Sequence, residues 1–143
     1  MSERLLIAYI DGRRIAIPAP QVHSVIELDS VMPVPLAPAF ITGITALRSR
    51  ALTVVDCRLA IGLEPAGAPC SQAIVTERDG YLYALRIDSA DDVAEQLGKP
   101  SRGPGQLGEG WNRVTHGMVE TAIGPALLVD IDRLIAGPAA QAA

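Results

Sequence analysis

Cysteine, histidine and aspartate are the side chains of this sequence whose types could support catalysis. Cys57 could act as a nucleophile if His23 or His116 served as its base. Asp56 and Asp130 could form a pair of carboxylates for acid and base catalysis. No glycine turn of the oxyanion type and no orienting acid accompanies the cysteine, and Cys is commonly a buried, small apolar residue. We therefore expect no catalytic residues and no enzyme activity.

Asp56 and Asp130 have a second interpretation as helix N-caps, for which Asp is among the preferred residues. Each aspartate follows a strand-like run of apolar residues. The two segments that contain them resemble one another: ALTVVDCRLAIG (51–62) and ALLVDIDRLIAG (126–137). The repeat places the two aspartates at equivalent positions of two lobes. It favours structural caps over a catalytic pair.

Charge and composition exclude several classes of function. The net charge is −4, and no stripe of Lys or Arg provides the footprint that nucleic acid requires. The two cysteines form no CxxC pair and lie far in sequence from both histidines, so we expect no metal and no cofactor. No stretch approaches the ~18 apolar residues of a membrane span, and no signal-like run begins the chain. We expect a cytoplasmic protein.

The composition and the turn signals predict an all-β domain. Apolar residues make up 49% of the 143 residues and only five residues are aromatic, so Val, Ile, Leu and Ala must form the core. Asp11-Gly12 and Asp79-Gly80 each separate two apolar runs, which predicts two tight β-hairpins. About nine short strands with regular turns favour closed barrels, because closure removes exposed strand edges.

The segments between these strands carry weaker signals. Residues 33–38 contain three prolines and should run extended, and residues 38–43 could form a short helical turn. Residues 89–97 fit either one helical turn or an extended arm. Residues 64–72 and 98–110 have the composition of loops. Trp111 follows the second loop and fits either an interface anchor or a cover over the open end of a barrel.

The run PVPLAPAFITGITALRSRALTVVDCRLAIGL (33–63) resembles the signature of the CheW family of chemotaxis coupling proteins. An extended proline arm, a P-x-F-I-x-G turn, an arginine corner, a strand ending in Asp-x-Arg and a short helix follow in the family's order. Residues 14–28, 73–93 and 116–135 are similar to further family segments. The resemblance covers nearly the whole chain.

The resemblance implies two five-stranded, SH3-like barrels packed on a shared apolar core, with short helical turns. We expect a single CheW-like domain over 1–143, with approximate lobes at 14–70 and 73–136, crossover of terminal strands, and a frayed tail at 137–143. The implied function is a non-catalytic adaptor at membrane-bound receptor arrays. It would link the cytoplasmic tip of a chemoreceptor to the regulatory domain of a CheA-type histidine kinase.

The resemblance also suggests where a receptor could bind. Carried over by position, Glu27 matches an acidic residue of the family and Arg48 its corner arginine, and the two could form an ion pair beside a receptor groove. The planar guanidinium group of an arginine can donate two parallel hydrogen bonds to a carboxylate. The alternative is that both are solvated charges worth ~0–1 kcal/mol. The candidate groove residues are Val25, Ile26, Glu27, Arg48, Ser49 and Arg50.

This chain departs from the family pattern around the arginine corner. The family's Asn and Gly are here Ala46 and Ser49, and its strand proline is Thr53. If the corner needs a positive φ, Ser49 must be strained. Arg50 adds a positive charge that could tune the choice of partner.

A second class of function stays open from the sequence. A small-molecule sensor or an enzyme could use the same barrels with a pocket between the two lobes. The sequence does not identify the receptor or kinase, the behaviour that the pathway controls, or the oligomeric state.

Overall fold

The computed structural model describes residues 3–64, 71–101 and 108–137. The tail predicted to fray lies outside this part of the chain, apart from Gly137. The elements in chain order are β1 (Arg4–Ile10), β2 (Arg13–Pro18), the 3-10 turn η1 (Ala19–Gln21), β3 (Ser24–Glu27), β4 (Ile41–Leu47), β5 (Arg50–Asp56), α1 (Cys57–Ile61), β6 (Gln72–Arg78), β7 (Tyr81–Ile87), β8 (Ser89–Glu95), α2 (Glu109–Val114), β9 (Thr115–Thr121), β10 (Gly124–Val129) and α3 (Ile131–Ala136).

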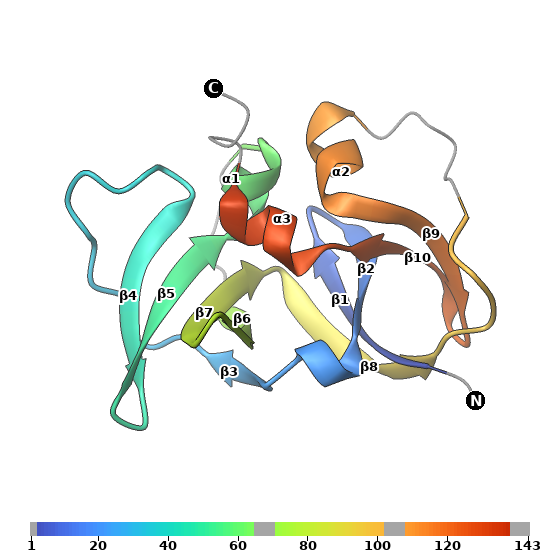
Figure 1. The fold of residues 1–143 in the computed structure, drawn as a ribbon, viewed down its shortest axis with the longest axis horizontal. Helices are drawn as coiled ribbons and strands as arrows, with labels where there is room; N and C mark the ends of the chain where they lie inside the picture. The colour runs from blue at the N-terminus through green and yellow to red at the C-terminus, as the bar shows by residue number, and fades with distance from the viewer. Residues whose placement is uncertain (1–2, 65–70, 102–107, 138–143) are drawn as a thin grey trace.

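The strands form two five-stranded sheets, which we call the terminal lobe and the central lobe. The terminal lobe has the order β8-β1-β2-β10-β9, and the central lobe has the order β3-β6-β7-β5-β4. Figure 1 shows the lobes side by side, with α1 and α3 near their junction. The predicted all-β fold of two five-stranded lobes is confirmed.

The predicted lobe boundaries at 14–70 and 73–136 differ from these sheets. The hairpin β6–β7 belongs to the central lobe, and β2 belongs to the terminal lobe. The reason is long-range pairing, since β7 pairs in parallel with β5 and β2 pairs in parallel with β10. The chain therefore begins in the terminal lobe, builds the whole central lobe from β3 to β7, and returns.

The two hairpins predicted from Asp-Gly turns are confirmed. Asp11 and Gly12 join β1 to β2 with φ values of 53° and 74°. Asp79 and Gly80 join β6 to β7 with φ values of 54° and 84°. Positive φ at both central residues is the geometry of a type I′ turn, whose twist matches that of the flanking strands.

The sequence repeat corresponds to a repeated unit of structure. In each lobe one strand pairs in parallel with a neighbour, and an aspartate at or directly after its end starts a short helix. Asp56 Oδ1 accepts a hydrogen bond from Leu59 N, and Asp130 Oδ1 accepts one from Arg133 N, each at 3.3 Å. Both aspartates have extended backbone, as N-caps do. The carboxylates are thus used to begin α1 and α3.

Strands β1 and β6 are buried on both of their faces. Leu5 and Ile7 of β1 point into the terminal lobe, whereas Leu6 and Ile10 point into the largest apolar cluster, which both lobes share. Burial on both faces explains why β1 reads as a continuous apolar run rather than an alternating one. The shared cluster, which we call the shared core, consists of Leu6, Ala8, Ile10, Ile15, Ile17, Phe40, Val55, Cys57, Ala60, Ile61, Ile74, Leu85, Ile87, Trp111, Val114, Leu127, Val129, Ile131 and Leu134.

Two arginines join the three short helices. Arg113 donates to the carbonyl oxygens of Ala60 in α1 and Arg133 in α3, and Arg133 Nη1 donates to Arg113 O at 3.0 Å. Carbonyls at helix C-termini lack intrahelical partners and attract cations. Burial and, secondly, the charge of Arg133 lower the pKa of the Arg113 guanidinium. Helices of five or six residues have little stability alone, so these contacts and the shared core hold them.

A charged network joins the lobes at the crossover from β7 to β8. Arg58 of α1 lies 3.1 Å from Asp11 (Nη1 to Oδ1) and 3.4 Å from Asp88 (Nε to Oδ1). The backbone N–H of Gly12 donates to Asp88 Oδ2 at 3.1 Å. The hairpin of one lobe is thereby tied to the first helix of the other.

Three local predictions need correction or completion. Trp111 lies in α2, which the sequence did not predict, and is buried in the shared core rather than offered as an interface anchor. Residues 38–43 form a single turn, in which Ile41 N donates to Pro38 O, and then the start of β4. Of the two options for residues 89–97, the extended one is observed as β8. Tertiary packing overrides local propensity in α2, which contains a glycine.

Gly110 provides a test of the packing of α2. A Cβ at this position would lie 1.7 Å from Ile61 O, so α2 can approach the end of α1 only through a glycine. We expect Gly110→Ala to lower the free energy of unfolding by about 3 kcal/mol or more, because backbone must move. Urea unfolding followed by circular dichroism would measure the loss. The matched control is Gly98→Ala, where a Cβ meets no atom within 4 Å. Equal effects of the two substitutions would contradict this packing.

Candidate functional site

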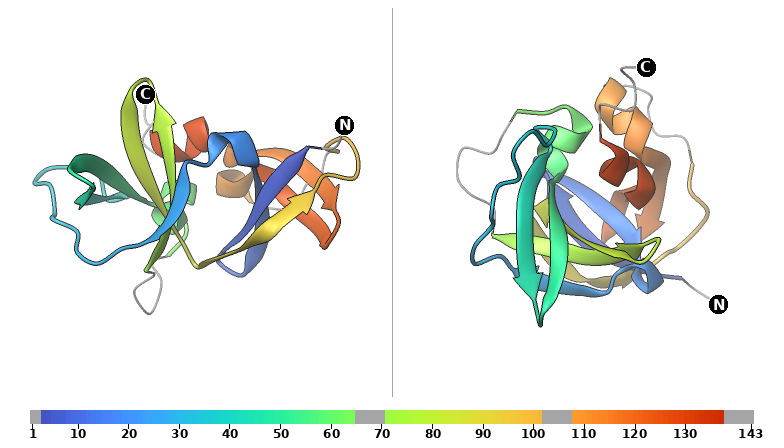
Figure 2. Two further views of the ribbon diagram at one scale, coloured as in Figure 1. Left: turned by 90° about the horizontal axis from the view of Figure 1, so that it is seen from below. Right: turned by 60° about the vertical axis from the view of Figure 1, so that its left-hand side comes forward.

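The candidate groove residues gather at one end of the central lobe. The hairpin β4–β5 and the arm before it, residues 31–38, lie at the end that faces away from the terminal lobe (Figure 1, Figure 2). A groove of about 340 Å³ runs there between β3 and the tip of the hairpin. We call it the tip groove. Its lining residues are His23, Ser24, Val25, Ile26, Leu47, Arg48, Arg50, Val75 and Leu82.

Four of the six predicted groove residues therefore come together. Val25 and Ile26 form one wall, and Arg48 and Arg50 form the other. The floor is apolar because Val75 and Leu82 belong to the interior of the central lobe, so the groove opens onto the end of that barrel. An apolar floor with a cationic wall suits a protein segment that carries apolar side chains and negative charge.

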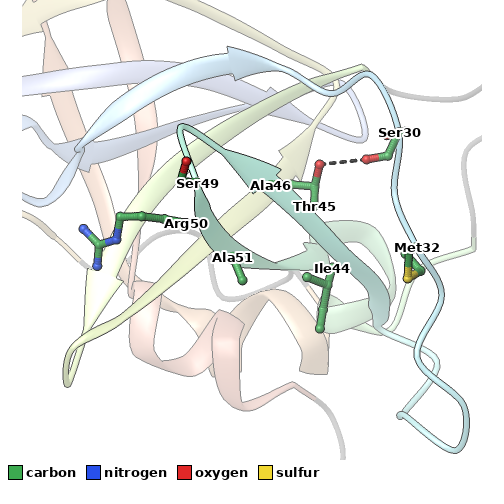
Figure 3. A pocket seen from close by; sticks show the side chains of 8 residues that line it. All are labelled: Ser30, Met32, Ile44, Thr45, Ala46, Ser49, Arg50 and Ala51. Carbon is green, nitrogen blue, oxygen red and sulfur yellow. Dashed lines mark hydrogen bonds between the residues drawn. The ribbon is translucent and has the colours of Figure 1, made fainter.

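A second hollow lies on the other side of the same hairpin. It has a volume of about 390 Å³ and combines apolar side chains with one arginine at its end (Figure 3). Figure 3 shows Arg50 extending away from Met32 and Ile44. We call this hollow the arm hollow. Its lining residues are Ser30, Met32, Ile44, Thr45, Ala46, Ser49, Arg50 and Ala51.

The arm beside this hollow exposes more apolar surface. Met32 is 74% exposed and Leu36 is fully exposed. Leu36 also has a φ of 66°, in a turn in which Ala37 N donates to Val34 O at 3.3 Å. A turn with Pro35 before a residue of positive φ is of type II, where Gly or Asn is usual. The sequence reasoning predicted an extended arm but did not identify it as a binding surface.

The tip of the hairpin is strained, as the departure from the family's glycine predicted. Arg48 and Ser49 have φ values of 50° and 70°, so both occupy the left-handed region. Two such residues between the paired Leu47 and Arg50 make a type I′ turn, for which Asn-Gly is the favoured sequence. Non-glycine residues in this region cost about 1 kcal/mol or more each.

The hypothesised ion pair between Glu27 and Arg48 is not formed. Among the described residues, no ion pair joins the two side chains, and Glu27 is not among the residues of the tip groove. Of the residues of β3, Ser24, Val25 and Ile26 line the groove. Glu27 is the last residue of the strand and is exposed, on the same face of β3 as Val25.

The residues that could do chemistry lie in separate surroundings. Cys57 is buried in the shared core, His23 lines the tip groove, and His116 Nε2 lies 3.1 Å from Asp130 Oδ2. Within residues 3–64, 71–101 and 108–137, no group of three or more His, Cys, Asp or Glu could hold a metal ion. In the same ranges no helix has the length and apolar character to cross a bilayer.

Comparison with known proteins agrees with this fold. The family model described as the CheW-like domain matches residues 4–139. Among solved structures, the chain is similar to the scaffolding protein TtCheW from Thermoanaerobacter tengcongensis, with a TM-score of 0.78 and 21% sequence identity. That similarity covers 91% of this chain and 90% of the other. The search of curated proteins gave no match.

Ser49 provides a test of the strain at the hairpin tip. Because glycine has no Cβ, Ser49→Gly should relieve the strain and raise the free energy of unfolding by about 0.5–1 kcal/mol. The measurement is urea unfolding. The control is Ser24→Gly in β3, where glycine should instead lower the stability by about 0.5–1 kcal/mol. If Ser49→Gly destabilised the protein as much as the control does, the turn would not have this geometry in solution.

Proposed function

Because this chain belongs to the family of CheW-like domains, we propose that it is a non-catalytic adaptor that couples chemoreceptors to a CheA-type histidine kinase in bacterial chemotaxis. The observation that carries the proposal is the pair of apolar surfaces on the two sides of the β4–β5 hairpin. An adaptor must bind two partners at once, which needs two surfaces. The protein would act in the cytoplasm at membrane-bound receptor arrays.

We assign the chemoreceptor tip to the tip groove. A receptor's cytoplasmic tip is helical, and an amphipathic helix binds by laying apolar side chains into a groove. Val25 and Ile26 offer an apolar wall, and Arg48 can contact a carboxylate at the rim. Contacts of this limited size fit the weak, reversible binding of a signalling assembly.

We assign the regulatory domain of the kinase to the arm hollow. Met32, Leu36 and Ile44 are exposed apolar residues on neighbouring segments, and Met32 pairs with Ile44 by two backbone hydrogen bonds of 2.8 Å. These bonds fix the arm against the edge of β4. The apolar surface is therefore presented on a rigid support, which reduces the entropy lost on binding.

Binding experiments with purified partners would test both assignments. The partners are cytoplasmic tip fragments of the source organism's chemoreceptors and the regulatory domain of its CheA-type kinase. We expect Arg48→Ala to weaken receptor binding at least threefold and leave kinase binding unchanged, since alanine keeps the same backbone strain but removes the guanidinium. We expect Met32→Glu to weaken kinase binding at least tenfold and leave receptor binding unchanged, because it places a charge in an apolar contact. Isothermal titration calorimetry would measure both.

The matched controls lie in the terminal lobe. Arg4→Ala removes a comparable exposed guanidinium, and Ile123→Glu adds a charge at another exposed apolar residue. Neither control should change either affinity. Failure of the wild-type protein to bind any receptor fragment and the kinase domain would refute the adaptor function. If Arg48→Ala and Met32→Glu each weakened binding to both the receptor fragment and the kinase domain, the two partners would not use separate surfaces.

The alternative, a sensor or enzyme with a pocket between the lobes, gains no support from the described residues. The shared core occupies the junction of the lobes, and both hollows of the hairpin lie at one end of the central lobe. A metabolite that raises the melting temperature of the protein would revive this alternative, because ligands stabilise the form they bind.

A further inference from the structure

Arg50 is the residue common to the tip groove and the arm hollow. Its side chain is exposed, and it stands on β5 directly after the turn, paired with Leu47 across the hairpin. Arg48 lies in the turn itself, where a fluctuation of the hairpin tip would move it. Arg50 is therefore the better positioned of the two guanidiniums.

The charges of Arg48 and Arg50 are not neutralised within the part of the chain that the structure describes. Neither guanidinium has an ion pair or a hydrogen bond there. By contrast, Arg58, Arg78 and Arg133 each pair with an aspartate. No carboxylate lines the tip groove or the arm hollow. In a chain of net charge −4, the hairpin tip thus presents two free cations beside apolar surface.

A partner of complementary chemistry would carry a carboxylate next to apolar side chains. A negatively charged partner is repelled by the net charge of this chain and attracted where unpaired cations lie, so the two arginines of the hairpin tip would help to fix its position. The planar guanidinium of an arginine can hold a carboxylate through two parallel hydrogen bonds. The flanking apolar residues would occupy the floor formed by Val75 and Leu82.

We propose that Arg50 is a specificity-determining residue of the tip groove, which selects receptor segments with an acidic residue adjacent to their apolar contacts. The proposal rests on the function proposed above, since it refines the partner of the same groove. Arg50 thereby adds a positive charge to the corner beside Arg48, and with it a narrower choice of receptor.

The test measures the affinities of receptor tip fragments and of the kinase regulatory domain for the wild-type protein, Arg50→Gln and Arg50→Glu, at two salt concentrations. Glutamine removes the charge and keeps a polar group that can form hydrogen bonds, on a shorter side chain. We expect Arg50→Gln to weaken binding about two- to fivefold at low salt and to reduce its salt dependence, as for an exposed ion pair. Arg50→Glu should weaken it more than tenfold, because like charges repel. Arg4→Gln in the terminal lobe is the control and should bind as the wild type does.

A double-mutant cycle identifies the acidic residue on the partner. Each Glu or Asp of the fragment's tip is replaced by its amide in turn. With one of these replaced fragments, Arg50→Gln should cause no further loss of affinity. If the wild-type protein binds the fragments and both Arg50 variants bind equally well, Arg50 does not set specificity, although the adaptor function stands. If the loss affects only the kinase domain, the assignment to the receptor is wrong. If the wild-type protein binds no fragment, the proposed function and this refinement both fail.

Discussion

The two lobes can bury the outer faces of their sheets only against one another. Each lobe encloses a small apolar cluster of its own, of six buried residues, and neither cluster is large enough for a stable domain. The shared core supplies the remaining burial, and the capped helices α1 and α3 contribute to it through Ile61, Ile131 and Leu134. Because the junction is filled in this way, the interior serves stability. Surfaces for binding are left to the outer ends of the lobes, where the hairpin β4–β5 lies (Figure 2).

Features that depend on a few neighbouring residues could be predicted from the sequence. Asp-Gly specifies a type I′ turn through the φ values that two residues must adopt, so both hairpins could be placed. An aspartate at the end of an apolar run specifies a helix start, and Asp56 and Asp130 occupy that position. The strain at Ser49 followed from comparing one residue with the glycine of a family pattern. In each case the physical cause is local.

Features that depend on distant segments could not be predicted. The helix α2 contains a glycine and has no side-chain cap, and it forms because Trp111 and Val114 are buried in the shared core. The division into lobes depends on the parallel pairing of β2 with β10, for which the sequence carries no local signal. The site shows the same limit, since the distance between Glu27 at the end of β3 and Arg48 in the β4–β5 turn depends on how distant segments pack. The sequence predicted an ion pair that the described residues do not form.

The hairpin tip and the arm beside it contain strained backbone and exposed apolar surface, both of which lower stability and would be absent from a purely structural turn. Arg48 and Ser49 occupy backbone conformations that favour glycine, and Leu36 does so while its side chain is fully exposed. Strain of this kind persists only where the surrounding structure enforces it. Here the pairing of β4 with β5 and of Met32 with Ile44 does so. The paired backbone fixes the positions from which the apolar and cationic side chains extend before any partner arrives, and less backbone conformational entropy is then lost on binding. The stability that the shared core supplies offsets the strain of the tip, and the proposed binding of partners there depends on that stability.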